Sequence, residues 1–405
     1  MRRRSFLALA ASLPLLRLPR PAAARTAQTP VAAGGDAELM ALLRLLPDDV
    51  LLDDGQVRYA NYGRQIAAMG FGDQRARLDF ETWLEAAREL GVPSAMDRAP
   101  VDAIWRDSLG FDARDLNLLL ERTSISGTIT IMRGTLGALT PARLGGMGYE
   151  PVETDGVTWY TIGDVNLLAT DHYIHTLHMG YLRHMAILDD GTVVGTTETD
   201  AMERVLALHA GKTGSFAEGR GAALASSPDD LVLAEIEDGA SLMPDLDPEL
   251  VARLPRSDGK TEAEVAAELE LDREEVARMP RIDLALLGLT AGWTREELRP
   301  ANDAPRSRAV AVLVPADRAD AEMIAETVTR RLTTEAMPES ARIDEPSWVE
   351  AFPGMVIETA PGGTSVVVEL TPVDGVPSTL LNHLRDLTHL PIFYWIGASA
   401  DTDSG

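Results

Sequence analysis

Hydrophobic and polar positions follow two different periods along this 405-residue chain. Up to residue 122, apolar residues recur every three or four positions, which is typical of amphipathic helices. Leu39, Leu42, Leu43 and Leu46 share one helical face, and Asp36 precedes them as a candidate N-cap. Thr82 and Glu85 have the spacing of a capping box. The pattern therefore predicts a helical N-terminal region, residues 36–122, with helices at 36–46, 78–90 and 101–122.

From residue 123 onward, β-branched residues alternate with others, as they do in strands. Asp155-Gly156 and Asp189-Asp190-Gly191 each separate two such runs, and these turns are typical of β-hairpins. This segment predicts strands and helices in one α+β unit, residues 123–240. The strands are expected at 128–132, 152–154, 157–162, 185–188 and 193–196, and the helices at 141–144 and 200–210.

A similar order of elements returns near the C-terminus. It predicts strands at 309–314, 355–359 and 365–370, helices at 319–332 and 378–387, and an apolar segment at 392–396. We therefore predict an α+β fold, in which a helical N-terminal region precedes two sheet-and-helix units, 123–240 and 308–397. Their shared order is compatible with ferredoxin-like layers and with a duplication.

The segment that joins the two units is strongly acidic. Residues 235–275 hold 14 acidic and 4 basic residues. Thr261 with Glu264, and Thr294 with Glu297, have capping-box spacing. Residues 241–307 are therefore predicted to be an acidic helical connector, and residues 398–405 a disordered tail.

The first 24 residues have the three-part pattern of a cleavable export signal. Arg3, Arg4, Phe6 and Leu7 follow the order of a twin-arginine signal, the type that exports folded proteins. The apolar run 6–16 rises about 16 Å as a helix, too short for a bilayer core of roughly 30 Å. Ala22 and Ala24 supply the small residues of a cleavage site. We expect cleavage after Ala24, a flexible tether at 25–35, and a periplasmic, cell-envelope or secreted location. The alternative is a buried N-terminal helix, although no acidic residue precedes Asp36.

Charge and cysteine content exclude several classes of function. The formal charge is −26, and the predicted signal carries five arginines and no acid, so its removal leaves −31. A surface this acidic repels nucleic acid and anionic lipid, so we expect neither as a partner. The chain has no cysteine, which excludes disulfides, thiolate nucleophiles, cysteine-ligated metals and a lipoprotein anchor. No later stretch approaches eighteen apolar residues, so no stable membrane insertion is expected after cleavage.

Several short motifs resemble those of uncharacterised exported bacterial proteins. They are Leu109-Gly110-Phe111-Asp112, Arg133-Gly134, Gly148-Tyr149-Glu150-Pro151 and Asp155-Gly156. The resemblance extends over residues 36–397. It implies an α+β fold and an extracytoplasmic location, and it carries no activity and no site residues.

Four of the seven histidines fall within thirteen residues: His172, His175, His178 and His184. Imidazole is a common ligand of zinc, copper, nickel and haem iron, and a spacing of three places two rings on adjacent helical turns. Asp171 is a further candidate ligand or second partner of a ring. The cluster predicts a metal or haem site. The alternative is that these histidines make only local hydrogen bonds, because the sequence lacks a His-Glu-x-x-His motif.

Five other short motifs lack features that their functions require. Ala210-Gly211-Lys212-Thr213-Gly214 lacks the first glycine of a phosphate-binding loop, so it is better explained as a helix end and a turn. Gly145-Gly146-Met147-Gly148 lacks dinucleotide-binding spacing. Residues 261–278 resemble a helix-turn-helix but are too acidic for DNA. The pairs Asp245/Asp247 and Asp189/Asp190 match no calcium loop, and no serine lies in Gly-x-Ser-x-Gly.

Three functional hypotheses remain. The first is an exported binding or scaffold protein without catalytic activity, whose partner is an envelope protein or a small-molecule ligand. The second is a metal- or haem-binding exported protein that uses the histidine cluster. The third is an extracytoplasmic hydrolase with a dispersed site.

Overall fold

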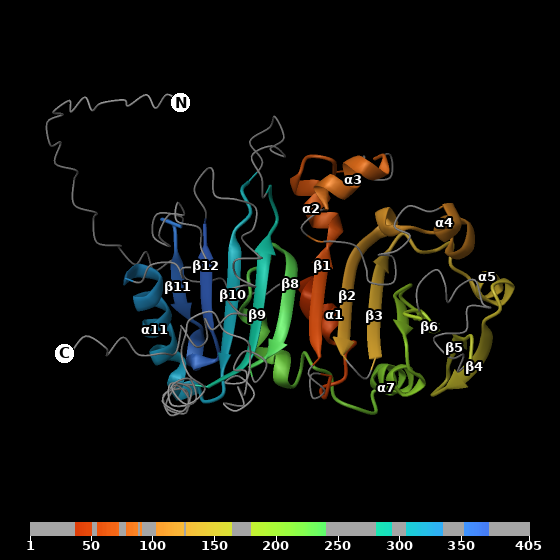
Figure 1. Cartoon of the computed structure of the whole chain (residues 1–405). Coiled ribbons are helices and arrows are strands. Elements are labelled where there is room, and N and C mark those ends of the chain that lie inside the picture. Colours follow the sequence, from red (N-terminus) through yellow and green to blue (C-terminus); the bar gives the residue numbers. More distant parts are fainter. Residues whose placement is uncertain are drawn as a thin grey trace, which may run out of the picture. The chain divides into compact units, whose positions relative to one another are not determined.

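In the computed structural model, the strands of both predicted units join one antiparallel sheet (Figure 1). All the residues that the structure describes belong to a single compact unit, Ala33–Gly405. They are residues 37–50, 55–72, 78–87, 90, 103–124, 127–163, 180–239, 281–293, 305–334 and 352–371.

Several predicted features lie outside the described residues. They include the signal residues Arg3, Arg4, Phe6, Leu7, Ala22 and Ala24, and the tether 25–35. The candidate N-cap Asp36, both capping-box pairs of the acidic connector, and the C-terminal segments 378–387, 392–396 and 398–405 are also outside them. These predictions are untested by the structure.

The order of strands across the sheet is β11-β12-β10-β9-β8-β1-β2-β3-β7-β6-β5-β4, and all neighbours are antiparallel. The N-terminal strands are β1 (Gln56–Asn61), β2 (Leu116–Ser124), β3 (Gly127–Gly134), β4 (Glu150–Thr154), β5 (Val157–Thr161), β6 (His184–Ile187) and β7 (Val193–Thr196). The C-terminal strands are β8 (Leu231–Asp238), β9 (Ile282–Thr290), β10 (Ala309–Pro315), β11 (Val356–Thr359) and β12 (Val366–Leu370).

The two sides of the sheet share one strand order, which starts where β1 pairs with β8. Outward from this junction the N-terminal side runs β1-β2-β3-β7-β6, and the C-terminal side runs β8-β9-β10-β12-β11. On each side, the first three strands of the half lie next to one another in chain order. The last two strands of the half follow them in reversed chain order. The hairpin β4–β5 extends the N-terminal side only. The first strand of each half thus lies at the centre of the sheet.

Apolar side chains cover both faces of the sheet and form two cores. Strand β10 is covered on both faces, so all of its positions are buried. Its sequence is therefore a continuous apolar run and does not alternate with polar residues. Alternation assigns Leu287 to the first core and Leu286 to the second.

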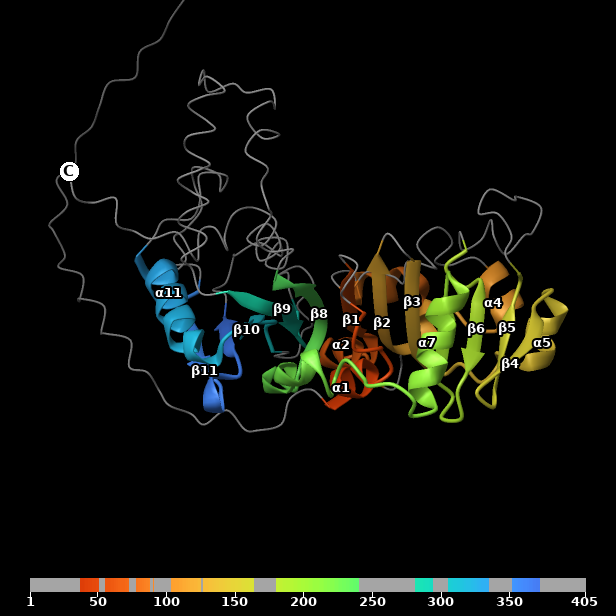
Figure 2. The same ribbon diagram turned by 90° about the horizontal axis from the view of Figure 1, so that it is seen from below.

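Helices contribute to both cores. The first core receives residues from α2 (Tyr62–Ala68), α3 (Phe80–Ala86), α4 (Ala103–Leu109), α5 (Pro141–Gly146) and α11 (Ala321–Thr334). The second receives residues from α1 (Ala37–Leu43) and α7 (Thr199–His209). Figure 2 shows α11 and α5 near opposite ends of the row of strands, in agreement with the contacts of α11 with β11 and of α5 with β4.

Short 3₁₀ helices complete the described elements. They are η4 (Ala113–Asp115), η5 (Arg220–Ser226), η7 (Arg318–Asp320) and η8 (Pro361–Gly363).

Most elements that were predicted after residue 123 are confirmed. Strands β3 to β7 and β10 to β12, and helices α5, α7 and α11, lie within a few residues of the predicted bounds. Asp155 and Gly156 both have positive φ, +56° and +80°, as the two-residue hairpin turn requires. The α+β class is therefore confirmed.

The prediction of a purely helical region at 36–122 is wrong at two places, β1 and β2. Residues 101–122 form α4 only as far as Leu109, and the apolar run from Leu116 becomes strand β2. A short apolar run fits a buried helix and a buried strand equally well by periodicity, and here the sheet covers β2 on both sides.

Two further predictions need correction. Residues 282–290 form strand β9, although the connector 241–307 was predicted to be helical, because this apolar run pairs with β8 and β10. Helix α3 is capped by Asp79 and not by Thr82, since the Asp79 carboxylate accepts a bond from the Thr82 backbone N–H at 2.9 Å.

The described helices include none that is long and apolar enough to cross a membrane.

Candidate functional site

The predicted histidine cluster is only partly described, because His172, His175 and His178 lie outside the described residues. His184 lies on β6 with 1% of its surface exposed. Its Nδ1 is 2.8 Å from the Thr161 hydroxyl, and its Nε2 is 3.4 Å from the Thr199 hydroxyl. The ring also meets the edge of Trp159. His184 therefore makes the local hydrogen bonds of the alternative interpretation.

Among the described residues, no group of three His, Asp or Glu side chains is arranged to hold a metal ion. The metal or haem prediction thus depends on residues that the structure does not describe, and it stays a prediction.

Two motifs that we explained as turns are turns in the structure. Helix α7 ends at His209, Gly211 has a φ of +72°, and the Lys212 backbone N–H donates to the Ala207 carbonyl. In the second turn, the Asp190 carboxylate accepts from the Thr192 backbone N–H and pairs with Arg133. Burial alone would raise the pKa of Asp190, but the bonds from Thr192 and the charge of Arg133 lower it.

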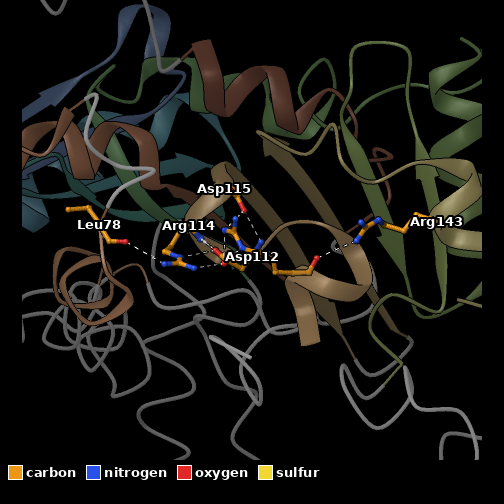
Figure 3. Close-up of polar contacts among 6 residues, drawn as sticks. Leu78, Asp112, Arg114, Asp115 and Arg143 are labelled. Carbon is orange, nitrogen blue, oxygen red and sulfur yellow. Dashed lines mark hydrogen bonds and ion pairs between the residues drawn. The ribbon is translucent and has the colours of Figure 1, made fainter. Parts of the chain in front are cut away.

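The densest ionic cluster, which we call the Asp112 cluster, joins α4 to the start of β2 (Figure 3). The Asp112 carboxylate accepts from Arg106 Nη2 at 2.7 Å and from Arg114 Nη2 at 2.8 Å, and it caps η4 through the Arg114 backbone N–H at 2.9 Å. Asp115 accepts a second bond from Arg106 and one from the Asp112 backbone N–H. Arg143 donates to three carbonyls at the end of α4, those of Arg106, Asp107 and Ser108.

The Asp112 carboxylate is buried and has several donors. Burial alone would raise its pKa, but the hydrogen bonds from Arg114 and Arg106 outweigh this effect and lower it. Every group in the Asp112 cluster has a partner within the chain, and these partners fix a helix end and a strand start. We therefore assign the cluster an architectural role.

The motifs behind the family resemblance also serve the fold. Gly110 has a φ of +86°, and a Cβ there would lie 2.7 Å from the Ala138 Cβ. A Cβ on Gly134 would lie 2.1 Å from the Asp115 carbonyl oxygen. The Tyr149 hydroxyl is buried and donates to the Leu182 carbonyl at 2.7 Å, and burial raises its pKa. These residues let the backbone and side chains approach closely.

A second set of polar residues crosses the centre of the sheet on the face of the first core. We call it the central polar row; it consists of Gln56, Arg58, Glu121, Thr130, Glu235 and Glu237. Arg58 on β1 lies directly opposite Glu121 on β2 and Glu235 on β8. Thr130 on β3 lies opposite Glu121. Directly opposite residues of antiparallel strands point to the same face, with Cβ atoms about 4.5–5.5 Å apart.

The central polar row is buried except at β1. Glu121, Glu235 and Glu237 are 2%, 3% and 5% exposed, while Gln56 and Arg58 are half-buried. Gln56 donates to the Glu237 carboxylate at 3.0 Å. Glu121 and Glu235 make further contacts within the chain. Of the six residues of the row, only Gln56 and Arg58, both on β1, are partly exposed.

Two groups of this row have no hydrogen-bond partner among the described residues. The Thr130 hydroxyl is fully buried and makes no hydrogen bond to any of them. No hydrogen bond or ion pair within the described part of the chain involves the Arg58 guanidinium. A buried polar group without a partner costs about 1–3 kcal/mol, so native structures usually avoid it or use it.

Other arginines at the sheet are held differently. Arg220 binds Asp238 at 2.6 Å and Asp283 at 2.8 Å, and the bonds to Asp283 raise its pKa. Arg308 pairs with Asp230 at 2.8 Å and also with Glu369. Each of these guanidinium groups binds two carboxylates, whereas the Arg58 guanidinium makes no hydrogen bond or ion pair with any described residue.

Sequence reasoning missed the central polar row. Arg58, Glu121 and Glu235 are 63 and 114 residues apart along the chain, and no short motif links them. One signal was present: Glu121 and Arg122 directly follow the run Leu118-Leu119-Leu120, and Glu235 and Glu237 alternate with buried apolar residues in β8. Charged residues inside such runs are unusual and mark either a paired charge or a site.

Comparisons with protein-family models, with curated proteins and with solved structures give no match.

Proposed function

We propose that this protein is an exported, non-catalytic binding protein, and that the central polar row holds its small-molecule ligand. The observation that carries the proposal is the Arg58 guanidinium, which has no ion-pair partner among the described residues although carboxylates lie on both sides of it. The unpartnered Thr130 hydroxyl in the same row supports it. A ligand that bonds to both groups offsets the cost of burying the Thr130 hydroxyl and gives the partly exposed Arg58 an ionic partner.

The chemistry of the row suits recognition better than turnover. A guanidinium between two carboxylates can bind charged groups in a fixed geometry. Hydrolases instead most often use a histidine as the general base, and the central polar row contains no histidine. Binding is therefore favoured over the hydrolase hypothesis.

We further propose that the two halves arose by duplication, which places the row on an internal pseudo-two-fold axis. In this comparison β1 corresponds to β8, β2 to β9 and β3 to β10. Leu116-Asn117-Leu118 of β2 then aligns with Ile282-Asp283-Leu284 of β9. Arg58 aligns with Glu235, the residue that lies directly opposite it in the sheet. The irregular register at Leu116–Leu118 then coincides with the one where Ile282 pairs with Pro315. Ligand sites favour such junctions between halves.

The pairs of counterpart residues also have similar side chains. Ile129, Ile131 and Met132 of β3 correspond to Val310, Val312 and Leu313 of β10.

The proposal of export is supported by the N-terminal sequence pattern alone. Extracytoplasmic binding proteins commonly carry such a signal.

The experiment is a thermal-denaturation screen of the purified mature chain against a library of amino acids, organic acids, amines and sugars. Ligand binding to the folded state alone stabilises it by about 2.7 kcal/mol at a hundredfold excess over Kd. We expect at least one compound to stabilise the wild type and Arg133→Met, but not Arg58→Met. Arg133 is the matched control, because its guanidinium is already held by Thr192 and Asp190.

The proposal fails if no compound stabilises the wild type, or if Arg58→Met is stabilised as much as the wild type. Chemical conversion of a bound compound by the wild type, lost in a point variant, would instead establish an enzyme.

A further inference from the structure

We infer that the free edge of β11 is a docking site for a further strand, and that its occupant is residues 392–396 of the same chain. Strand β11 is the last strand on the C-terminal side, and among the described strands it pairs only with β12. An edge strand presents a row of unpaired N–H and C=O groups, which is a template for another strand. We call this side of β11 the β11 edge.

The backbone groups at the β11 edge follow from the pairing of β11 with β12. The Ala360 backbone N–H donates to the Ser365 carbonyl at 2.9 Å, so these two residues are a hydrogen-bonded pair. Hydrogen-bonded and non-hydrogen-bonded pairs alternate along antiparallel strands, so Ile357 and Thr359 belong to pairs of the second kind. Their N–H and C=O groups therefore point away from β12, toward the β11 edge.

Exposed side chains distinguish the two ends of the sheet. Met323 on α11 and Val356 on β11 are 45% and 42% exposed, and they are the exposed large apolar residues of the described chain. Helix α11 contacts β11 at this end of the sheet (Figure 1). The last strand at the other end, β4, instead exposes Glu150, Pro151 and Glu153, and charges and proline at an edge discourage strand addition. The β11 edge is therefore the one suited to a further strand.

The N-terminal side of the sheet has a strand at the corresponding position. Strand β6 corresponds to β11 in the shared strand order, and its outer neighbour is β5. Trp159 and Tyr160 are adjacent in β5 and pack in different cores, so β5 is apolar on both faces. Residues 392–396 also hold an adjacent tyrosine and tryptophan, and all five are apolar or aromatic. A strand that is covered on both faces has such a continuous apolar sequence.

The path of the chain leads to the β11 edge. Strand β12 ends at Leu370, next to the start of β11, because Glu369 pairs with Val356. The helix predicted at 378–387 rises about 15 Å, close to the roughly 17 Å length of a five-residue strand, so it returns the chain to the other end of β12. Residues 392–396 then run parallel to β12 and antiparallel to β11, in keeping with a sheet in which all neighbours are antiparallel.

The handedness of this connection agrees with the N-terminal side. Helix α11 connects β10 to β11 and packs in the first core. Connections between parallel strands of one sheet are almost always right-handed, and β12 runs opposite to β10. A right-handed connection from β12 toward the same edge therefore crosses the other face, that of the second core. Helix α7, which follows the corresponding strand β7, packs in the second core as well.

A segment of the same chain is favoured over a second copy of the chain. Residues 371–391 tether the segment to β12, which gives it an effective concentration of millimolar order at the β11 edge. The formal charge of −26 makes two copies repel each other as they approach.

The test is disulfide trapping, for which a chain without cysteine gives no background. Val356→Cys is combined in turn with a cysteine at each position from 392 to 396, and peptide mass spectrometry locates the bonds formed under mild oxidation. Successive side chains of a strand point to opposite faces, and a disulfide needs close Cβ atoms, so we expect bonds to alternate positions only. As the control, Glu153→Cys on β4 replaces Val356→Cys and should form no bond to any of the five positions.

Amide hydrogen exchange tests the backbone pairing without cysteines. Tyr394→Pro and Trp395→Pro each remove one N–H, and adjacent N–H groups of a strand point to opposite sides, so one of the two variants loses a donor to β11. In that variant we expect the Ile357 and Thr359 amides to exchange at least about tenfold faster than in the wild type. Thr402→Pro is the control and should leave their exchange unchanged. Unchanged exchange in β9 and β10 verifies that each variant is folded.

Three results would overturn the inference. The first is bonding of Val356→Cys to all five positions alike, or to none of them. The second is a disulfide between two chains, seen as a covalent dimer on a non-reducing gel, which would assign the β11 edge to a second copy. The third is wild-type exchange at Ile357 and Thr359 in both proline variants.

Discussion

The Asp112 cluster and the central polar row both bury carboxylates next to arginines, but their hydrogen bonding differs. In the Asp112 cluster, two guanidinium groups and a backbone N–H converge on one carboxylate. In the central polar row, neither the Arg58 guanidinium nor the Thr130 hydroxyl has a partner among the described residues. Satisfied charges stabilise a fold, whereas unsatisfied ones cost stability and are retained where a ligand uses them. This contrast separates architecture from a candidate site.

The largest effect is expected from Asp112→Ala. The substitution leaves Arg106 and Arg114 without their shared carboxylate and removes the cap of η4, so the free energy of unfolding should fall by about 2–4 kcal/mol. Denaturant titration measures the change. Asp189→Ala, at an exposed turn position, is the control and should change the free energy by less than about 0.5 kcal/mol. Equal effects of the two variants would contradict the architectural assignment.

Acid should produce a smaller effect at the same place, since a protonated carboxyl keeps part of its hydrogen bonding. The pKa of Asp112 is lower in the folded chain than its ordinary value of about 3.9. Its contribution to stability is therefore complete above pH ~4 and is lost as the pH falls through the lowered folded-state pKa. Unfolding midpoints measured from pH 5 downward should fall more steeply for the wild type than for Asp112→Asn. Parallel curves would show that Asp112 gains nothing from its arginines.

The smallest predicted effect tests the central polar row. Replacement of two buried threonines by valine should change the free energy of unfolding in opposite directions. Thr130 and Thr196 are both fully buried in strands. The Thr196 hydroxyl donates to the Glu198 carbonyl at 2.9 Å, whereas the Thr130 hydroxyl has no partner among the described residues. Without ligand, Thr130→Val should raise the free energy of unfolding by about 1 kcal/mol, and Thr196→Val should lower it by about the same amount. Chemical denaturation of both variants decides the question. A loss of stability in Thr130→Val would mean that its hydroxyl is satisfied in solution.

How far the sequence predicted the fold depended on the length and flanks of each segment. Hairpins with Asp-Gly turns were predicted correctly, because Asp155 and Gly156 adopt the positive φ that few other residue pairs allow. The strand at 116–124 was predicted to be helical, because a short run of leucines fits either structure until its neighbours are known. The same ambiguity hid β9 within the predicted connector.

The candidate site was beyond the reach of the sequence. The histidines attracted attention because they are close in sequence, yet the one that is described, His184, makes local bonds to Thr161 and Thr199. Arg58, Glu121 and Glu235 come from three distant segments, and only the register of β1 with β2 and β8 aligns them. A one-residue slip in either register would place Glu121 or Glu235 on the opposite face.

The sequence by itself determined the α+β class, the turn positions, the absence of thiol chemistry and the acidic charge. These properties follow from composition and from backbone preferences that act over a few residues. Only the tertiary structure decided that one sheet unites both halves, that Asp112 forms ion pairs with two neighbouring arginines, and that Arg58 lies opposite two glutamates. Strand pairing between segments a hundred or more residues apart depends on the packing of whole faces, and no local pattern encodes it.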